Sequence, residues 1–209
     1  MRIIKIDKVK FKKNIFKIYF ENNDTIIVLA DTIVKFNLKI GKDLVGKEYK
    51  EIMFYDKSNR IMSDALALVA LRSYSSKWLQ EKLLQKGYDK NIVLNVISRL
   101  EELNYINDGK FSKNYAVYLS QKGNGEFAIK AKLEKHGINK VLIMEALDEV
   151  KSLEEFYKQI IKIICLKFKN FKWKNKSEAR RVALFFLRRG FSLENIVKAF
   201  REYKNISID

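Results

Sequence analysis

Apolar residues recur along the chain at helical spacing, and three times the pattern is interrupted by a glycine with the same surroundings. The glycines are Gly87, Gly137 and Gly190, about fifty residues apart. Two apolar residues four apart precede each glycine, and an apolar residue, a polar residue and four spaced apolar residues follow it. These columns hold Leu79, Leu83, Tyr88, Asp89, Val93, Val96, Ile97 and Leu100 in the first copy, Ile129, Leu133, Ile138, Asn139, Ile143, Ala146, Leu147 and Val150 in the second, and Val182, Phe186, Phe191, Ser192, Ile196, Ala199, Phe200 and Tyr203 in the third.

Each copy predicts two helices joined by a tight glycine turn. A glycine ends a helix at low cost because it adopts a left-handed backbone, and Asp, Asn or Ser then caps the next helix. Lys86, His136 and Arg189 precede the glycines, where a cation suits the helix dipole. About twenty residues remain in each period, room for a third helix. The pattern therefore predicts tandem three-helix repeats, which typically build an elongated, curved body.

The first thirty residues follow a different pattern, since apolar and polar residues alternate around Asn22–Asp24. This predicts a small antiparallel sheet, followed by a short helix with Asp31 as a candidate cap. Helices are also expected over 46–56 and 61–73. The overall prediction is a mainly α fold of three tandem three-helix repeats behind an N-terminal β module. The predicted domains are 1–58 for the β-rich module and 59–106, 107–151 and 152–209 for the repeats, the last opening with Ser152 as a cap.

Net charge and the lengths of the apolar runs limit the kinds of partner and location expected for this chain. The chain has 209 residues, no proline and a formal net charge of +17, concentrated towards its two ends. A cationic surface favours a polyanionic partner such as nucleic acid, although a lysine-rich solvated surface is the alternative. No apolar run approaches the ~18 residues of a membrane span, and charges interrupt any signal-peptide core. We therefore expect a cytoplasmic protein with no membrane association.

Candidate catalytic chemistry is scarce. The single cysteine, Cys165, follows the apolar face of its helix and is expected to be a small buried hydrophobe. The single histidine, His136, is expected to be an exposed helix-end cation. These counts exclude a zinc site of known spacing, and no phosphate-binding, dinucleotide or hydrolase motif occurs. We expect no enzyme, no metal and no cofactor.

One segment alternates basic and aromatic residues. It runs from Lys167 to Arg181 and includes Phe168, Phe171 and Trp173. Such alternation suits phosphate contact combined with base stacking, or else the aromatic residues belong to the core and only the cations face water. The candidate DNA- or partner-binding cations are Lys167, Lys169, Lys172, Lys174, Lys176, Arg180, Arg181, Arg188 and Arg189.

Several motifs together resemble the RecX family, bacterial regulators of the RecA recombinase. The residues that carry the resemblance are Leu71-Arg72-Ser73-Tyr74-Ser75, Lys86-Gly87-Tyr88, Leu103-Asn104-Tyr105-Ile106-Asn107-Asp108, Lys122-Gly123-x-Gly125 and Phe186-Leu187-x-Arg189-Gly190-Phe191. The segment 29–38 is similar to the extra N-terminal module of Gram-positive members. The resemblance covers essentially the whole chain, although Glu126 and Phe127 follow Gly125 where the family often has a proline.

The resemblance implies a monomeric modulator, mainly an inhibitor, acting in the SOS response, DNA repair and homologous recombination. It would bind RecA protein, single- and double-stranded DNA and the groove of the RecA–DNA filament, restraining ATP hydrolysis and strand exchange. By matching position, the candidate filament contacts are Arg72, Lys82, Lys110, Lys122 and Lys130. The alternatives are a sequence-nonspecific or helix-turn-helix DNA-binding protein and a helical scaffold that binds only proteins.

Overall fold

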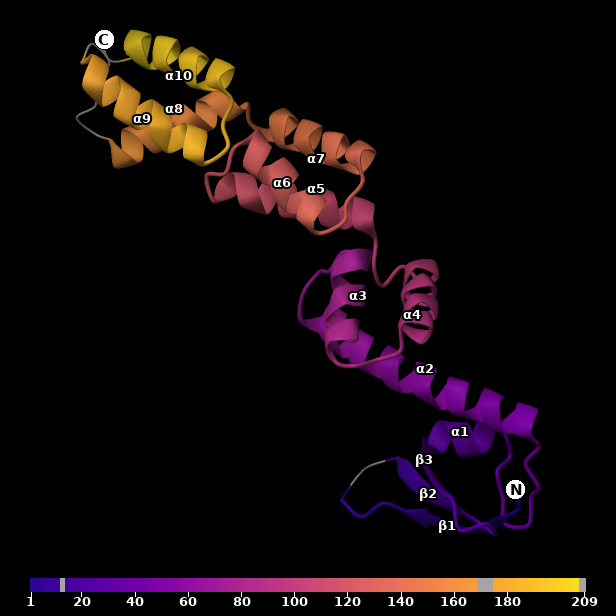
Figure 1. Cartoon of the computed structure of the whole chain (residues 1–209). Coiled ribbons are helices and arrows are strands. Elements are labelled where there is room, and N and C mark those ends of the chain that lie inside the picture. Colours follow the sequence, from indigo (N-terminus) through magenta and orange to yellow (C-terminus); the bar gives the residue numbers. More distant parts are fainter. Residues whose placement is uncertain (12–13, 169–174, 207–209) are drawn as a thin grey trace. The chain divides into compact units, whose positions relative to one another are not determined.

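The computed structural model describes residues 1–11, 14–168 and 175–206. Within them, a three-stranded antiparallel sheet is followed by helices in succession, as predicted (Figure 1). The strands are β1 (Ile3–Lys8), β2 (Ile15–Phe20) and β3 (Thr25–Leu29). The helices are α1 (Ala30–Lys35), α2 (Gly46–Leu71), α3 (Ser76–Gln85), α4 (Lys90–Glu102), α5 (Asp108–Gln121), α6 (Glu126–Lys135), α7 (Lys140–Leu153), α8 (Phe156–Lys167), α9 (Lys176–Arg188) and α10 (Leu193–Ile206).

The chain divides into two compact units. The first combines Met1–Leu71 with Gln80–Glu102, and the second combines Arg72–Leu79 with Leu103–Asp209. The boundary therefore falls within α3, whose N-terminal turn belongs to the second unit. The elongated, curved arrangement of the repeats stays a prediction.

The sheet has the order β1-β2-β3, and its inner face carries the core of the N-terminal module. Ile18 and Phe20 of β2 are fully buried, as is Val28 of β3, in keeping with the period-two alternation. The hairpin between β2 and β3 turns through Asn23, which has a φ of 65°. Asparagine tolerates this left-handed conformation better than most residues, so the predicted Asn22–Asp24 turn is confirmed.

Helix α2 is a single helix, so the expectation of separate helices over 46–56 and 61–73 is wrong. The carboxylate of Asp56, 2% exposed, accepts hydrogen bonds from the Leu29 backbone (2.6 Å), the Thr32 hydroxyl (2.8 Å) and Arg60 Nε (2.7 Å). A buried carboxylate needs such partners. These bonds hold β3 and α1 against the middle of α2. The predicted domain boundary at residue 58 falls inside it.

The three glycine turns adopt the predicted conformation. Gly87, Gly137 and Gly190 have φ values of 83°, 79° and 80°, and each follows the last turn of a helix. After the turns, Asp89 accepts a hydrogen bond from Ile92 N, as Asn139 does from Leu142 N and Ser192 from Asn195 N. These caps satisfy backbone donors that the helix itself leaves unpaired.

Two of the glycine turns are docking points for the start of another helix. The backbone N–H groups of Gly125 and Phe127, at the start of α6, donate to the carbonyl oxygens of Arg189 and Gly190 at 2.8 and 2.9 Å. A Cβ on Gly190 would collide with the backbone of Ala128. The close approach of two backbones therefore requires a glycine here.

The turn at Gly137 receives the start of α3 in the same way. The Ser75 hydroxyl donates to the His136 carbonyl at 2.7 Å, and a Cβ on Gly137 would collide with the Lys77 side chain. Ser75 also caps α3 by accepting a hydrogen bond from Trp78 N. By contrast, a Cβ on Gly87 would meet no described atom within 4 Å.

Four local predictions are wrong. Cys165 is exposed rather than buried, because Ile160 and Ile164 fill the inward face of α8. Asp31 lies inside α1, which Leu29 precedes as the N-cap. Ser152 lies in the last turn of α7, where its hydroxyl donates to the Glu149 carbonyl, and α8 begins only after Glu155.

The fourth concerns His136, which is half-buried among aromatic rings rather than exposed. Its ring centroid lies 4.4 Å from Trp78, 5.3 Å from Tyr115 and 5.8 Å from Phe111. The docked start of α3 supplies Trp78, so a contact distant in sequence determines the environment of this histidine.

Candidate nucleic-acid interface

Arg72 begins a cationic and aromatic surface in the second unit. Its guanidinium lies 4.2 Å from the ring centroid of Trp78 and 4.8 Å from that of Tyr74. Arginine packs well on aromatic faces because its charge is delocalised and weakly hydrated. Arg72 is exposed, so this stacking presents its guanidinium at the surface in a defined position.

Helix α5 continues this surface with a ladder of rings. Phe111 and Tyr115 stack at 5.4 Å, Tyr115 and Tyr118 stack at 6.2 Å, and Lys122 Nζ lies 5.6 Å from the Tyr118 centroid. The sequence produces the ladder because residues three and four apart share one face of a helix. Trp78 lies 6.3 Å from Phe111 and so links the ladder to Arg72. We call Arg72, Trp78, Tyr115, Tyr118 and Lys122 the basic-aromatic strip.

The two tyrosines of the strip are a half-buried ring and an exposed ring. Partial burial raises the pKa of Tyr115 above its ordinary value, and the neighbouring Tyr118 adds to this, whereas the Arg72 charge acts in the opposite direction. Tyr115 is therefore a neutral, half-buried ring at physiological pH. Tyr118 is 52% exposed and offers its face to solvent. Exposed rings between cations suit a single-stranded nucleic acid, whose bases stack while its phosphates meet the charges.

At the end of α5 the strip meets two cations from the last repeat. Arg189 Nη1 donates to the carbonyl oxygens of Lys122 and Gly123 at 3.3 and 3.1 Å, and its guanidinium lies 4.8 Å from the Phe185 ring centroid. Lys167 Nζ lies 6.0 Å from the same ring. Arg189 thus satisfies helix C-terminal carbonyls and holds its positive charge beside Lys122.

The structure brings only some of the predicted binding residues together. Arg72, Lys122, Lys167 and Arg189 lie on or next to the strip. The predicted cations Lys169, Lys172 and Lys174 lie outside the described residues. The remaining cations are placed elsewhere: Lys82 in α3, where it donates to Gln85, Lys110 at the start of α5, Lys130 in α6, and Lys176, Arg180, Arg181 and Arg188 along α9.

The aromatic members of the strip are not among the predicted binding residues. Tyr115 and Tyr118 fit the apolar pattern of their helix, which is also typical of core residues. Their spacing of three, together with Lys122 four residues later, is the signal that marks a shared face. Trp78 gave no such signal, because it reaches the ladder only through the docking of α3.

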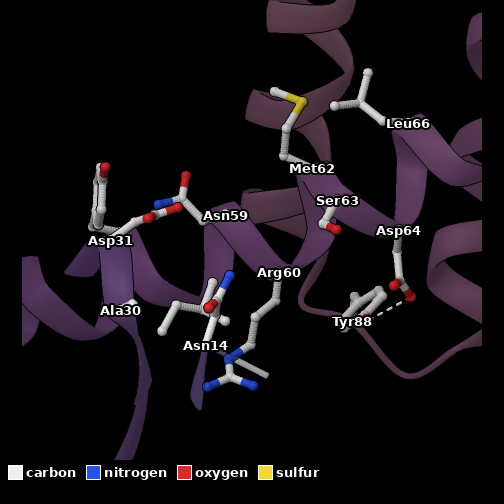
Figure 2. Close-up of a pocket in the computed structure, with 12 residues that line it drawn as sticks. Asn14, Ala30, Asp31, Asn59, Arg60, Met62, Ser63, Asp64, Leu66 and Tyr88 are labelled. Atoms are coloured by element: carbon white, nitrogen blue, oxygen red, sulfur yellow. Dashed lines mark hydrogen bonds between the residues drawn. The ribbon is translucent and has the colours of Figure 1, made fainter. Parts of the chain in front are cut away.

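A groove of about 720 Å³ lies along α2 in the first unit and is lined by Arg60, Asp64 and Tyr88, among others (Figure 2). Two of its charged side chains, Arg60 and Asp64, already have partners within the fold. Arg60 binds Asp56, and Asp64 accepts from Lys86 (2.6 Å) and from the Tyr88 hydroxyl (2.9 Å). The hydrogen bond from Lys86 lowers the pKa of Asp64, and burial raises that of Tyr88. We interpret this groove as structural.

Two further findings concern the described ranges. Within them, no three His, Cys, Asp or Glu side chains are grouped so that they could bind a metal ion. None of the helices described there is both long and apolar enough to cross a membrane.

Comparison with known proteins shows which family the chain resembles. A crystal structure titled as regulatory protein RecX superposes with a TM-score of 0.72 at 20% identity, covering 96% of this chain and 98% of that one. At this identity the likeness concerns the fold. Regulatory protein RecX of Bacillus subtilis is 30% identical over 207 residues, which span 97% of this chain and 78% of that protein. The chain belongs to the RecX family.

Other RecX comparisons agree. The family model described as the first three-helix domain of RecX matches residues 62–100, which contain the turn at Gly87. Regulatory protein RecX of Streptococcus pneumoniae is 32% identical over 149 residues, spanning 70% of this chain and 57% of that protein. The crystal structure of RecX from Lactobacillus salivarius superposes with a TM-score of 0.62 at 19% identity, covering 72% of this chain and 98% of that one.

Proposed function

We propose that this RecX-family protein regulates the RecA recombinase, mainly as an inhibitor. It binds RecA and the groove of the RecA–DNA filament, and so restrains ATP hydrolysis and strand exchange. The observation that carries the proposal is the 30% identity to a RecX regulatory protein across 97% of the chain. The protein acts in the cytoplasm as a monomer, without catalysis of its own.

The basic-aromatic strip supports a role on a nucleoprotein filament. Its cations suit a phosphate backbone, and its rings suit exposed bases or apolar side chains of a partner. The tandem repeats also present the same helix pair several times, which fits a partner that is itself repetitive.

The helix-turn-helix alternative receives less support. A recognition helix is expected to present cations to phosphates and base edges. The helices that follow the glycine turns are not strongly basic. In α7, for example, Lys140 and Lys151 are outnumbered by Glu145, Asp148 and Glu149. Direct binding of single strands through the strip is the stronger form of the DNA-binding hypothesis.

The experiment is RecA's single-strand-dependent ATP hydrolysis, measured while the protein is added. We expect the rate to fall, and an unchanged rate at stoichiometric excess would contradict the proposal. The double variant Arg72→Gln, Lys122→Gln is expected to inhibit less well than wild type. A charge-matched control is Lys135→Gln, Lys140→Gln, which removes two exposed cations outside the strip.

Salt dependence separates charge-driven DNA binding from protein-only binding. Contact with about five duplex phosphates predicts that log K falls with log salt at a slope of about −4 to −5. A helical scaffold that binds only proteins predicts no salt-sensitive DNA affinity. The slope is measured by titrating labelled DNA at several salt concentrations.

A further inference from the structure

A groove of about 420 Å³ lies in the second unit where the end of α5 meets α8 and the end of α9. Ile163 and Leu166 give it an apolar side, and most of the other lining residues are polar and include four cations from three helices or their ends. The lining cations are Lys122, Lys162, Lys167 and Arg189. The groove starts at Lys122, so it continues the basic-aromatic strip.

The charge of the groove favours an anion. Glu154 is the carboxylate that lines it, and Lys162 pairs with this group at 2.6 Å. Arg189 is fixed by its bonds to the carbonyl oxygens of Lys122 and Gly123. Lys122 and Lys167 lie over aromatic rings, and neither makes an ion pair within the described residues. Two cations are therefore available at the rim.

A second observation that points to a ligand concerns Gln159. Its side chain lines the groove, is 7% exposed, and donates through Nε2 to the Glu154 carbonyl at 3.3 Å. Its Oε1 atom is buried, and within the described residues it has no hydrogen-bond partner. An unpartnered buried acceptor is costly, so it favours a ligand that brings an N–H donor.

We propose that this groove holds one nucleotide unit of a single-stranded nucleic acid. The phosphate lies between Lys122 and Lys167, and an N–H on the edge of the base donates to Gln159 Oε1. The face of the base lies against Ile163 and Leu166. All four DNA bases carry an N–H donor, so the site accepts any sequence.

An acidic peptide also combines an anion with N–H donors. The apolar side of the groove and its continuity with the stacked rings of Tyr115 and Tyr118 favour the nucleotide, since a planar base can use both. The proposal rests on the proposed function only in naming DNA as the partner, and binding can be measured without RecA.

The test uses the full chain and fluorescence anisotropy with a labelled oligo(dT). In Lys122→Gln, Lys167→Gln, we expect affinity at low salt to fall about tenfold or more and the salt slope to decrease in magnitude by about 0.7, the value for one single-strand phosphate. The charge-matched control Lys135→Gln, Lys140→Gln is expected to change affinity less than about threefold. Equal losses in the two double variants would overturn the site, since charge alone would then explain binding.

Gln159→Met gives a sharper readout. It keeps the side-chain volume and removes both the unpartnered acceptor and the long hydrogen bond from Nε2 to the Glu154 carbonyl, two effects of opposite sign, so the free protein should melt at a temperature similar to that of wild type. Oligo(dT) affinity is nevertheless expected to fall about threefold to tenfold, the range for one lost hydrogen bond. Unchanged affinity in this variant would contradict the proposed contact with the base.

Two competitors identify the ligand class. Thymidine monophosphate at high concentration is expected to displace oligo(dT) weakly and poly-glutamate hardly at all. Poly-glutamate that competes strongly, and loses affinity in Lys122→Gln, Lys167→Gln, would overturn the nucleotide in favour of an acidic protein partner. The same variants are also assayed with RecA. If they bind oligo(dT) as tightly as wild type while the protein still inhibits RecA's ATP hydrolysis, the groove proposal is wrong and the regulatory function is retained.

Discussion

The turn at Gly87 and the turns at Gly137 and Gly190 have the same backbone conformation but different surroundings. A Cβ on Gly87 would point into open space among the described residues, whereas it would strike Lys77 at Gly137 and the Ala128 backbone at Gly190. The first turn therefore requires glycine only for its positive φ. The other two also require it because the start of another helix packs against them.

The residues before these glycines differ in the same way. Lys86, His136 and Arg189 occupy one column of the repeat. Lys86 pairs with Asp64, His136 lies among aromatic rings, and Arg189 binds the end of α5. The same local pattern thus forms a simple turn at Gly87 and, at Gly137 and Gly190, a turn against which another helix packs, which we call a joint. Substitutions should distinguish these two roles.

The largest effect is expected for Gly190→Ala. The substitution forces a left-handed alanine and also drives a Cβ into backbone atoms, which have little room to move. We expect about 3 kcal/mol or more of lost stability. Urea unfolding at pH 7 measures this, and a loss no greater than that of Gly87→Ala would remove the distinction between turn and joint.

Gly137→Ala is expected to be intermediate, at about 2 kcal/mol, because the atoms it strikes belong to a side chain. Gly137→Val should cost more, since a β-branched residue resists this φ. The double variant Lys77→Ala, Gly137→Ala tests the part of the contact made by Lys77 Cγ and Cδ, since alanine keeps the Cβ. The cost of Gly137→Ala should be smaller in the Lys77→Ala background, and simple additivity would contradict the contact.

Gly87→Ala is expected to cost about 1 kcal/mol, the price of the backbone conformation alone. Hydrogen exchange should show the loss within α3 and α4. A cost similar to that of Gly190→Ala would mean that this turn, too, packs closely against something.

The smallest effect is expected for Lys86→Gln, which removes an ion pair with a 39% exposed Asp64. Because Lys86 lowers the pKa of Asp64, this stabilisation is present above the unfolded pKa of about 4 and is lost as the pH falls through the lower, folded value. Wild type should therefore melt slightly higher than the variant at pH 7, and the two should converge near pH 2. A difference that persists at pH 2 would rule out the ion pair as its source.

Local chemistry made much of the fold predictable. A glycine flanked by apolar columns and followed by Asp89, Asn139 or Ser192 determines its own turn and cap within a few residues. The failures at α2 and at His136 have tertiary causes. Asp56 is buried in α2 because β3 and α1 bring it hydrogen-bond donors, and His136 is half-buried because α3 docks beside it.

The sequence predicts the cations that belong to the candidate site but not which of them lie together in the folded chain. Arg72, Lys122, Lys167 and Arg189 were all named from charge or position, yet they meet only through the packing of four helices or their ends. Tyr118 gave an apolar helical signal that the structure assigns to the surface. The groove at Gln159 could not be read from sequence, because an unpartnered acceptor is a property of the folded chain.

The most direct test of the regulatory role is co-sedimentation with RecA filaments assembled on single-stranded DNA. Wild type is expected to pellet with the filaments in proportion to RecA, and Arg72→Gln, Lys122→Gln is expected to pellet less than its charge-matched control Lys135→Gln, Lys140→Gln. Wild-type protein that stays in the supernatant at micromolar RecA would contradict the account.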